Sequence, residues 1–138
     1  MSDNNVVDFL EIEPYVSEKH SHLVSAWLDV RKLSPNIIEN PPTIGMIALV
    51  NNRPVAVGFI RLAEGGLGIF DGLCTNPDCG PMLRNNCLNK LVEALIKEAK
   101  NWEVATILAW SSDKNTLTRS EKFGFRKIPD SVIYLNLK

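Results

Sequence analysis

Hydrophobic and polar residues recur along this chain with two spacings, the alternation typical of strands and the 3.6-residue period typical of helices. Residues 67–75 form an apolar run rich in strand-forming residues, and the segment 76–81, with two prolines and Gly80, cannot continue it. A helix is predicted over residues 83–102, where the apolar stripe consists of Leu88, Leu91, Val92, Leu95, Ala99 and Trp102. The centre of the chain therefore predicts a strand, an irregular loop and a long amphipathic helix.

The same spacings predict the elements that precede this stretch. A strand lies within Val6–Val16, and Ser17 then offers an N-cap for a helix whose apolar stripe ends near Leu33. The runs Ile44–Val50 and Val55–Leu62 flank turn residues and predict a hairpin that leads into the strand at 67–75. Three consecutive antiparallel strands are therefore expected.

Residues 34–43 contain three prolines and predict a loop with a short helical turn at Asn36–Glu39. Long irregular connections in small domains often cover binding sites, so this segment is either a lid or a plain connector.

The remaining elements follow the long helix. Ala105–Trp110 reads as a buried strand that is parallel to the strand at 67–75, because a helix connects the two. A last helix is predicted over Lys114–Phe123, with Asp113 at its cap and Gly124 past its end, and Val132–Leu137 reads as a terminal strand. The pattern predicts one α/β domain over residues 1–138, with a mixed, mostly antiparallel sheet and helices on both faces.

Composition narrows the function classes. The formal net charge is −1, and no basic stripe is visible, so neither nucleic acid nor a membrane surface is an expected partner. The chain has no apolar run of membrane-spanning length and its first residues do not resemble a signal peptide, so a cytoplasmic protein is expected. Cys74, Cys79 and Cys87 are expected to be reduced thiols, since their spacing does not suit a zinc site.

Candidate chemistry centres on the predicted strand–loop–helix. Free N–H groups and the helix dipole both favour an anion at the start of a helix, so the loop at 76–85 is a candidate anion site. Asp71 is the only charge in its strand, and a charge in an apolar strand is costly unless it is paired or functional. Asp71 is therefore either a catalytic base or an ordinary paired or exposed side chain.

Three stretches resemble the GNAT superfamily of CoA-dependent N-acyltransferases, and their order covers nearly the whole chain. They are residues 55–59 after the hairpin turn, residues 73–78 followed by Leu88, Leu91 and Leu95, and residues 113–128 with the Phe123-Gly124-Phe125 ending. The resemblance implies a sheet of six or seven strands and acetyl-CoA as co-substrate. It also implies that the backbone of Leu73, Cys74 and Thr75 would bind the pantetheine amides.

The loop that would bind the CoA pyrophosphate departs from the family pattern. That pattern is an Arg or Gln followed by two glycines spaced two residues apart. Here Gly80 takes the basic or amide position, Met82 lies within the motif, and Leu83 and Asn85 replace the glycines. The replacing side chains are expected to crowd the phosphates, and Pro81 removes an N–H donor. Arg84 either compensates beside the phosphates or is a solvated first-turn residue.

The catalytic positions depart as well. Many members of the family use a tyrosine in the last helix to protonate the leaving CoA thiolate, and Ser120 stands at that place. Asp113 corresponds to an asparagine of the family, although an N-cap role needs no cofactor. Asp71 is the candidate general base for the acceptor amine.

Two functions follow from the resemblance. The first is an N-acetyltransferase in which a small-molecule or protein amine attacks acetyl-CoA directly. The second is a GNAT-like binding or structural module without catalysis. The terminal strand Val132–Leu137 could also form the edge of a homodimer.

Overall fold

A computed structural model of the chain describes residues 9–111 and 113–138. One sheet contains five strands in the order β1-β2-β3-β4-β5. The strands are β1 (Leu10–Pro14), β2 (Ile44–Val50), β3 (Arg53–Ala63), β4 (Leu67–Thr75) and β5 (Thr106–Leu108). The helices are α1 (Ser17–Val30), α2 (Asn36–Glu39), α3 (Pro81–Asn101) and α4 (Lys114–Lys122), and a 3₁₀ turn, η1 (Glu64–Gly66), joins β3 to β4.

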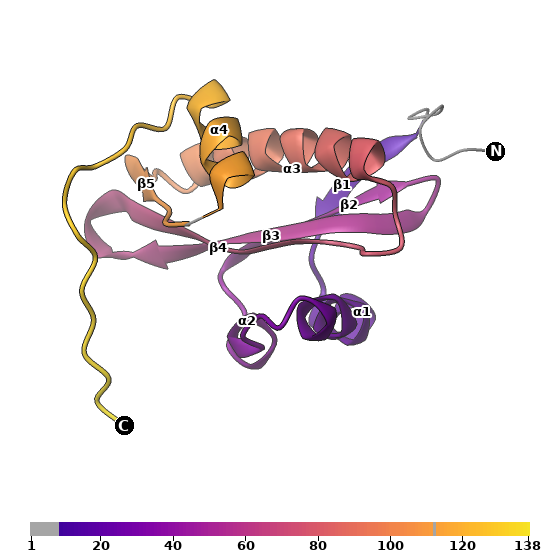
Figure 1. The fold of residues 1–138 in the computed structure, drawn as a ribbon, viewed down its shortest axis with the longest axis horizontal. Coiled ribbons are helices and arrows are strands. Elements are labelled where there is room, and N and C mark those ends of the chain that lie inside the picture. The colour runs from indigo at the N-terminus through magenta and orange to yellow at the C-terminus, as the bar shows by residue number, and fades with distance from the viewer. Residues whose placement is uncertain (1–8, 112) are drawn as a thin grey trace.

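The sheet separates two helical layers (Figure 1). Helices α3 and α4 cover one face, and α1 and α2 cover the other. The pairs β1–β2, β2–β3 and β3–β4 are antiparallel, whereas β4–β5 is parallel because the chain returns through α3. The mixed, mostly antiparallel sheet with helices on both faces is thus confirmed.

The expected strand count of six or seven is wrong. Five strands are found among residues 9–111 and 113–138, and the terminal segment Val132–Leu137 is not a strand, because it pairs with none of these residues. The first strand begins at Leu10, and the part of its predicted range up to residue 8 lies outside the described residues. The predicted fifth strand shortens from Ala105–Trp110 to Thr106–Leu108. The expected turn at Asn36–Glu39 forms as α2.

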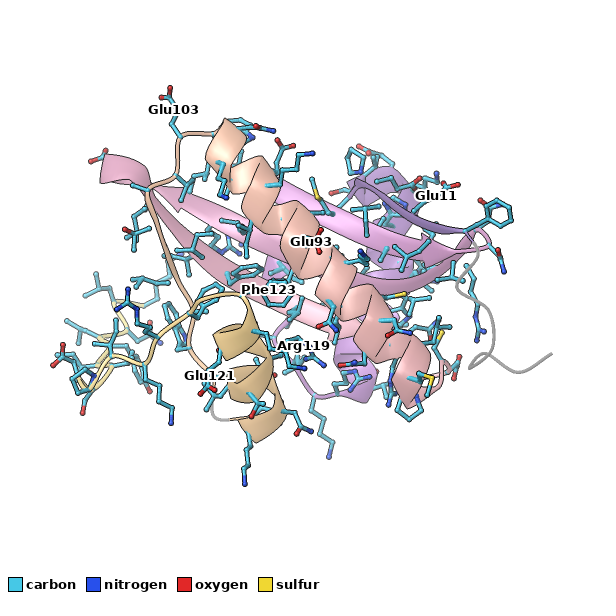
Figure 2. The ribbon with its side chains drawn as sticks, turned by 90° about the horizontal axis from the view of Figure 1, so that it is seen from above. Glu11, Glu93, Glu103, Arg119, Glu121 and Phe123 are labelled. Atoms are coloured by element: carbon cyan, nitrogen blue, oxygen red, sulfur yellow. The ribbon has the colours of Figure 1, made fainter. Side chains whose placement is uncertain are left out.

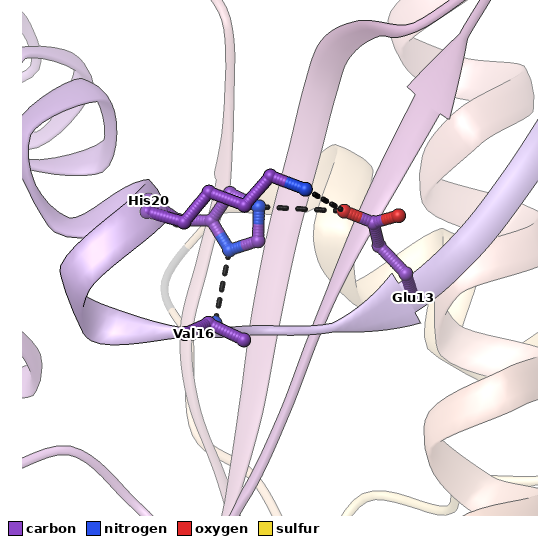
Figure 3. Close-up of polar contacts among 4 residues, drawn as sticks. Glu13, Val16 and His20 are labelled. Carbon is purple, nitrogen blue, oxygen red and sulfur yellow. Dashed lines mark hydrogen bonds and ion pairs between the residues drawn. The ribbon is translucent and has the colours of Figure 1, made fainter.

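Helix α1 begins without the predicted Ser17 cap. The N-cap is Val16, and no side chain caps the helix. Instead the Val16 N–H donates to Nδ1 of the buried His20 (2.9 Å), whose Nε2 faces the Glu13 carboxylate at 3.4 Å (Figure 3). The imidazole fixes the junction between β1 and α1, because it bonds the backbone N–H of Val16, the residue that links the strand to the helix.

The core is divided between the two faces of the sheet. On the α3 face, buried Leu91 and Leu95 of α3 pack with Ile60, Val55 and Ala48 of the strands. On the other face, the buried side chains come from α1, α2 and strands β2–β4: Val24, Trp27, Leu28, Ile37, Ile47, Leu49, Val57, Phe59 and Cys74. Burial on both faces explains why the strand sequences are almost continuously apolar.

Helix α4 forms as predicted, but it buries none of its residues. Its N-cap is Asp113, which accepts hydrogen bonds from the backbone N–H (2.9 Å) and hydroxyl (2.7 Å) of Thr116. Gly124 follows the helix with φ of 91°, the left-handed conformation expected past a C-terminus. Within the described part of the chain, we find no helix long and apolar enough to cross a lipid bilayer.

Candidate functional site

The candidate site begins where β4 and β5 part. The two strands pair only from Leu67 with Thr106 to Ile69 with Leu108. Strand β4 continues for six more residues, Phe70 to Thr75, while β5 ends. Along this stretch the edge of β4 that faces away from β3 has no strand partner among the described residues. An edge of this kind presents free N–H and C=O groups to an extended ligand.

A bulge at Gly72 determines which side chains flank this edge. Phe59 pairs with Asp71 and Val57 with Cys74, so Gly72 and Leu73 together oppose the single residue Gly58. Gly72 has φ of 67°. Regular strand alternation would place Asp71 and Leu73 on one face, but they lie on opposite faces because the extra residue reverses the alternation after Gly72.

Asp71 is placed on the face covered by α1 and α2, directly opposite the buried Phe59. Its side chain is 38% exposed, and its Oδ2 accepts a 2.7 Å hydrogen bond from Nε of Arg61 on β3. The charge in the apolar strand is therefore paired. The carboxylate can still reach solvent, so this geometry fits both interpretations that the sequence left open.

The end of the open edge is tied to α1. Arg31, the C-cap of α1, donates to the carbonyl oxygen of Thr75 (3.3 Å) and to its hydroxyl (2.7 Å). Thr75 and its neighbour Cys74 are both buried. Burial raises the pKa of the Cys74 thiol even though Arg31 lies beside it. Cys74 is therefore a packed thiol at neutral pH and not a nucleophile.

The loop after β4 leads into the N-terminus of α3 with several free donors. Gly80 is the N-cap, Pro81 is the first helical residue, and no side chain caps the helix. The Arg84 N–H is the first to bond back, to the Gly80 carbonyl at 3.0 Å. The N–H groups of Gly80, Met82 and Leu83 have no hydrogen-bond acceptor among the described residues.

The expectation that the Leu83 side chain crowds the start of α3 is wrong. Its side chain is buried in the core beneath α3 with Cys79 and Cys87. Met82 is exposed instead. A leucine replaces a glycine of the family pattern at this position because the side chain has an apolar core to occupy.

Two arginines lie at the start of α3. Arg84 is half-buried, and its guanidinium has no hydrogen bond or ion pair to the described residues. Arg119 comes from α4 and lies between α4 and α3 (Figure 2), where its NH2 group donates to Oδ1 of Asn85. Asn85 is thus held toward α4. Free N–H groups, the helix dipole and two guanidinium groups together favour a phosphate-sized anion.

The two candidate residues near α4 are both bonded within their own helix. The Ser120 hydroxyl donates to the Leu117 carbonyl at 2.7 Å. Asp113 is exposed, and its bonds to Thr116 hold the pKa of the Asp113 carboxyl below its usual range. Asp113 is thus an N-cap, as the alternative reading of the sequence had it.

Three arginines that sequence reasoning missed surround the candidate residues. Arg31 meets Thr75, Arg61 meets Asp71, and Arg119 meets Asn85. Arg61 lies ten residues from its partner, and a charge in the strand that precedes Asp71 could have suggested the pair. The other two pairs join residues 44 and 34 positions apart, so no local signal predicts them.

A separate groove of about 340 Å³ lies at the other end of α3. Tyr15, Pro41, Pro42, Glu98 and Trp102 are among the residues that line it. At about 1.5 Å of rise per residue, Glu98 is about 25 Å along α3 from its N-terminus. The prolines of the 34–43 segment, a lid or a plain connector, therefore border a groove that is distinct from the candidate anion site.

Comparisons with known proteins agree with this geometry at the level of the fold. No protein-family model matches the chain, and no curated protein matches its sequence. A predicted acetyltransferase from Clostridium acetobutylicum, crystallised with acetyl-CoA, matches 94% of this chain and 97% of its own, at 20% identity and a TM-score of 0.69.

Two further solved structures are similar. A GNAT-family acetyltransferase from Staphylococcus aureus covers 87% of this chain and 86% of its own, at 14% identity and a TM-score of 0.70. An aminoglycoside 6′-acetyltransferase of type Ii covers 84% and 83%, at 18% identity and a TM-score of 0.71. Identities this low establish the architecture alone. The strand order, the parting of β4 and β5 and these likenesses together show that the chain has the fold of the GNAT-family acetyltransferases.

Proposed function

We propose that this protein is an acyl-CoA-dependent N-acetyltransferase that acts on an amine by direct attack. The observation that carries the proposal is the open edge of β4 over residues 70–75, which runs toward the donor-rich N-terminus of α3. An extended chain with amide groups and a phosphate at its end, as in CoA, suits these two features together. The fold neighbour crystallised with acetyl-CoA supports the same co-substrate.

In this proposal the chain binds CoA with three sets of groups. The backbone of Leu73, Cys74 and Thr75 pairs with the pantetheine amides. Within the chain, the Thr75 carbonyl oxygen already accepts a hydrogen bond from Arg31. The N–H groups of Gly80, Met82 and Leu83 hold the pyrophosphate. Arg84 and Arg119 supply the positive charge that the family places in its own loop motif. Asn85 orients Arg119, and Asp113 orients α4.

Bound acetyl-CoA supplies the thioester that the amine attacks. The chain must orient the amine and accept its proton, since a protonated amine has no lone pair to attack with. Asp71 is the proposed base, directly or through a water. Arg61 holds the carboxylate in one orientation through the 2.7 Å bond. The Ser120 proton is directed at the Leu117 carbonyl, so Ser120 is a weak candidate for the acid that protonates the CoA thiolate.

The second candidate is a binding or structural module of the same fold without catalysis. Two observations favour it: Asp71 has an ion-pair partner, and Ser120 bonds to its own helix. Only the transferase requires CoA, so binding and turnover are tested separately.

Calorimetric titration with CoA, and with acetyl-CoA, tests the binding step. Binding of either should release measurable heat and raise the melting temperature, because a ligand of the native state alone stabilises it. No heat and no shift at millimolar ligand would exclude the transferase and leave the module without catalysis. Arg84→Ala should weaken CoA by roughly tenfold, given a charge-assisted bond of about 1.5 kcal/mol. Lys97→Ala, an exposed cation on the far part of α3, is the control and should leave affinity unchanged.

Release of free thiol from acetyl-CoA tests the transfer step with small amines, a lysine peptide and an aminoglycoside as acceptors. The aminoglycoside is included because a fold neighbour is named for that substrate. Asp71→Asn should abolish turnover of any accepted amine while CoA affinity stays the same. Ser120→Ala should keep most of the turnover. Undiminished turnover in Asp71→Asn would exclude this residue as the base.

A further inference from the structure

The groove of about 340 Å³ at the C-terminal end of α3 has no role in the proposed function. Its volume is at the lower end of the range found for small-molecule sites. Its walls come from three places in the chain: the junction of β1 and α1, the segment 41–46 that leads into β2, and the last turn of α3. None of the residues in these walls is assigned to CoA or to proton transfer. The groove is therefore a separate candidate site.

The charge in the groove is negative. Glu98 is the only charged side chain among the described residues that line it. Glu98 is half-buried and accepts a 3.1 Å hydrogen bond from Nδ2 of Asn101, but no described cation forms an ion pair with it. Lys97 and Lys100 are exposed neighbours on α3 that do not line the groove. A partly desolvated carboxylate of this kind favours a cationic ligand.

The backbone around the groove has the same preference. The C-terminal end of a helix is the negative end of its dipole, which favours a cation beside the last turn. Glu98 lies in the last turn of α3, and Trp102 is the C-cap. Three residues of the walls contribute no N–H donor, because they are prolines: Pro14, Pro41 and Pro42. The groove thus differs in sign from the start of the same helix, where free N–H groups favour an anion.

Aromatic side chains suit the groove to an organic cation. Trp102 lines it and is 53% exposed, so its indole ring is available to a ligand. Tyr15 also lines it, and contacts with Phe59 and His20 hold its ring, at centroid distances of 4.9 and 5.7 Å. An aromatic ring attracts a cation placed over its face. Rigid proline and aromatic walls also lower the entropy that is lost when a ligand binds.

We propose that this groove binds a small organic ammonium ion. Glu98 is the counter-ion, the Trp102 indole contacts the charged group, and Pro41 and Pro42 pack against the apolar part of the ligand. This inference stands apart from the proposed function, because it uses no residue assigned to CoA or to the reacting amine.

Proton–nitrogen correlation NMR tests the proposal, because it observes the indole N–H groups of the three tryptophans. Loss of one signal in Trp102→Phe assigns the Trp102 indole. Phenethylammonium chloride should shift that signal saturably and leave the signal of Trp110, which is 63% exposed outside the groove, in place. Phenethyl alcohol, the neutral analogue of similar shape, should bind roughly tenfold more weakly, because it lacks the charge. Asp71→Asn should leave the Trp102 shift unchanged, which separates this site from amine transfer.

Calorimetric titration with phenethylammonium tests the two main contacts. Glu98→Gln should weaken binding by roughly tenfold, because the charge-assisted contact is lost. Glu93→Gln is the matched control, since it removes the same charge from an exposed position on α3, and it should bind like the original chain. Trp102→Ala should weaken binding more than Trp102→Phe, which keeps an aromatic face.

Three results would overturn the proposal. The first is no saturable shift of the Trp102 signal at tens of millimolar ligand. The second is equal affinity for the ammonium ion and the alcohol, since the groove would then be merely apolar. The third is unchanged affinity in Glu98→Gln, because the ion would then bind elsewhere.

Discussion

The fold holds the two sides of the open slot, the unpaired stretch between residues 70–75 of β4 and the elements that follow β5, with different firmness. Strand β4 and helix α3 form one side, where Leu91, Leu95 and Cys87 are completely buried in the core. β5 and α4 form the other side, where no residue is buried and the described side-chain ties to the first side include the Arg119–Asn85 bond and the Phe125–Phe70 contact. A slot with one firm side and one weakly held side can adjust to a ligand without disturbing the core. Four predictions test this contrast, from the largest expected effect to the smallest.

The largest effect is expected from removing a leucine from each side. Leu91→Ala on α3 should lower the free energy of unfolding by about 2–5 kcal/mol, because it leaves a cavity in the core. Leu117→Ala on α4 should cost roughly 1 kcal/mol or less, because that side chain is only half-buried. Urea unfolding measures both. Equal losses would show that α4 belongs to the same cooperative core and that the contrast is wrong.

The bulge in β4 offers the second test. At Gly72 an added Cβ would lie 2.6 Å from Cδ1 of Ile37 in α2, and φ is 67°. Gly72→Ala should therefore cost about 2–4 kcal/mol, from backbone strain and the overlap together. Gly65→Ala is the matched control: its φ is 74°, but nothing lies within 4 Å of the added atom. Thermal unfolding should show the larger loss of stability for Gly72→Ala. Similar losses would mean that α2 moves to accommodate the added methyl group at little cost.

The third test is the pH dependence of the free energy of unfolding, to which a buried thiol on the firm side contributes. Burial raises the pKa of Cys87 from 9.0 to about 11, with the neighbouring Cys79 acting in the same direction. The folded state thus holds this proton more tightly than the unfolded state. The stability due to it is complete below pH 9 and is lost as the pH rises toward 11, by at most about 3 kcal/mol. Cys87→Ala should flatten the slope of unfolding free energy over that range, and an unchanged slope would contradict this assignment.

The smallest effect is expected on the weakly held side. There, stability is lost as the pH falls and not as it rises. The Thr116 hydroxyl, and then its backbone N–H, lower the pKa of Asp113. The capping stabilisation is present above the usual aspartate pKa of 3.8 and is lost as the pH falls through the lowered value. The protection factors of the α4 amides, which compare exchange with the intrinsic rate at the same pH, should fall in acid and in Asp113→Ala, whereas Asp113→Asn should keep the cap at all pH values. Equal exchange in the two variants would show that the cap does not hold α4.

The sequence predicted the firm side more completely than the weakly held one. The limits of β2 and β4 agree with their predicted ranges, since each is an apolar run bounded by turn residues. The long helix was predicted two residues short at its start, because Pro81 was assigned to the loop and not to the first helical turn. Val132–Leu137 has the composition of a strand, but a strand exists only where an aligned edge meets it.

The candidate site shows the same division. Local spacing was sufficient to predict the strand, loop and helix that carry the candidate anion site, and to give Asp113 its capping role. It could not show that Leu83 turns into the core, or that the Gly72 bulge separates the face of Asp71 from that of Leu73. Both facts depend on which residues from other elements lie beside Leu83 and Gly72 in the folded chain. A one-residue insertion in a strand changes every face that follows it.

The sequence by itself determined the order of elements, the apolar faces that bury them and the strand–loop–helix at the centre, because these follow from local period and turn chemistry. The tertiary structure alone decided that β4 and β5 part after three pairs, which opens the slot. It also decided that Arg31, Arg61 and Arg119 meet Thr75, Asp71 and Asn85. Charges that are distant in sequence find partners only after the sheet and helices have packed, so one sequence carries no local sign of where they meet.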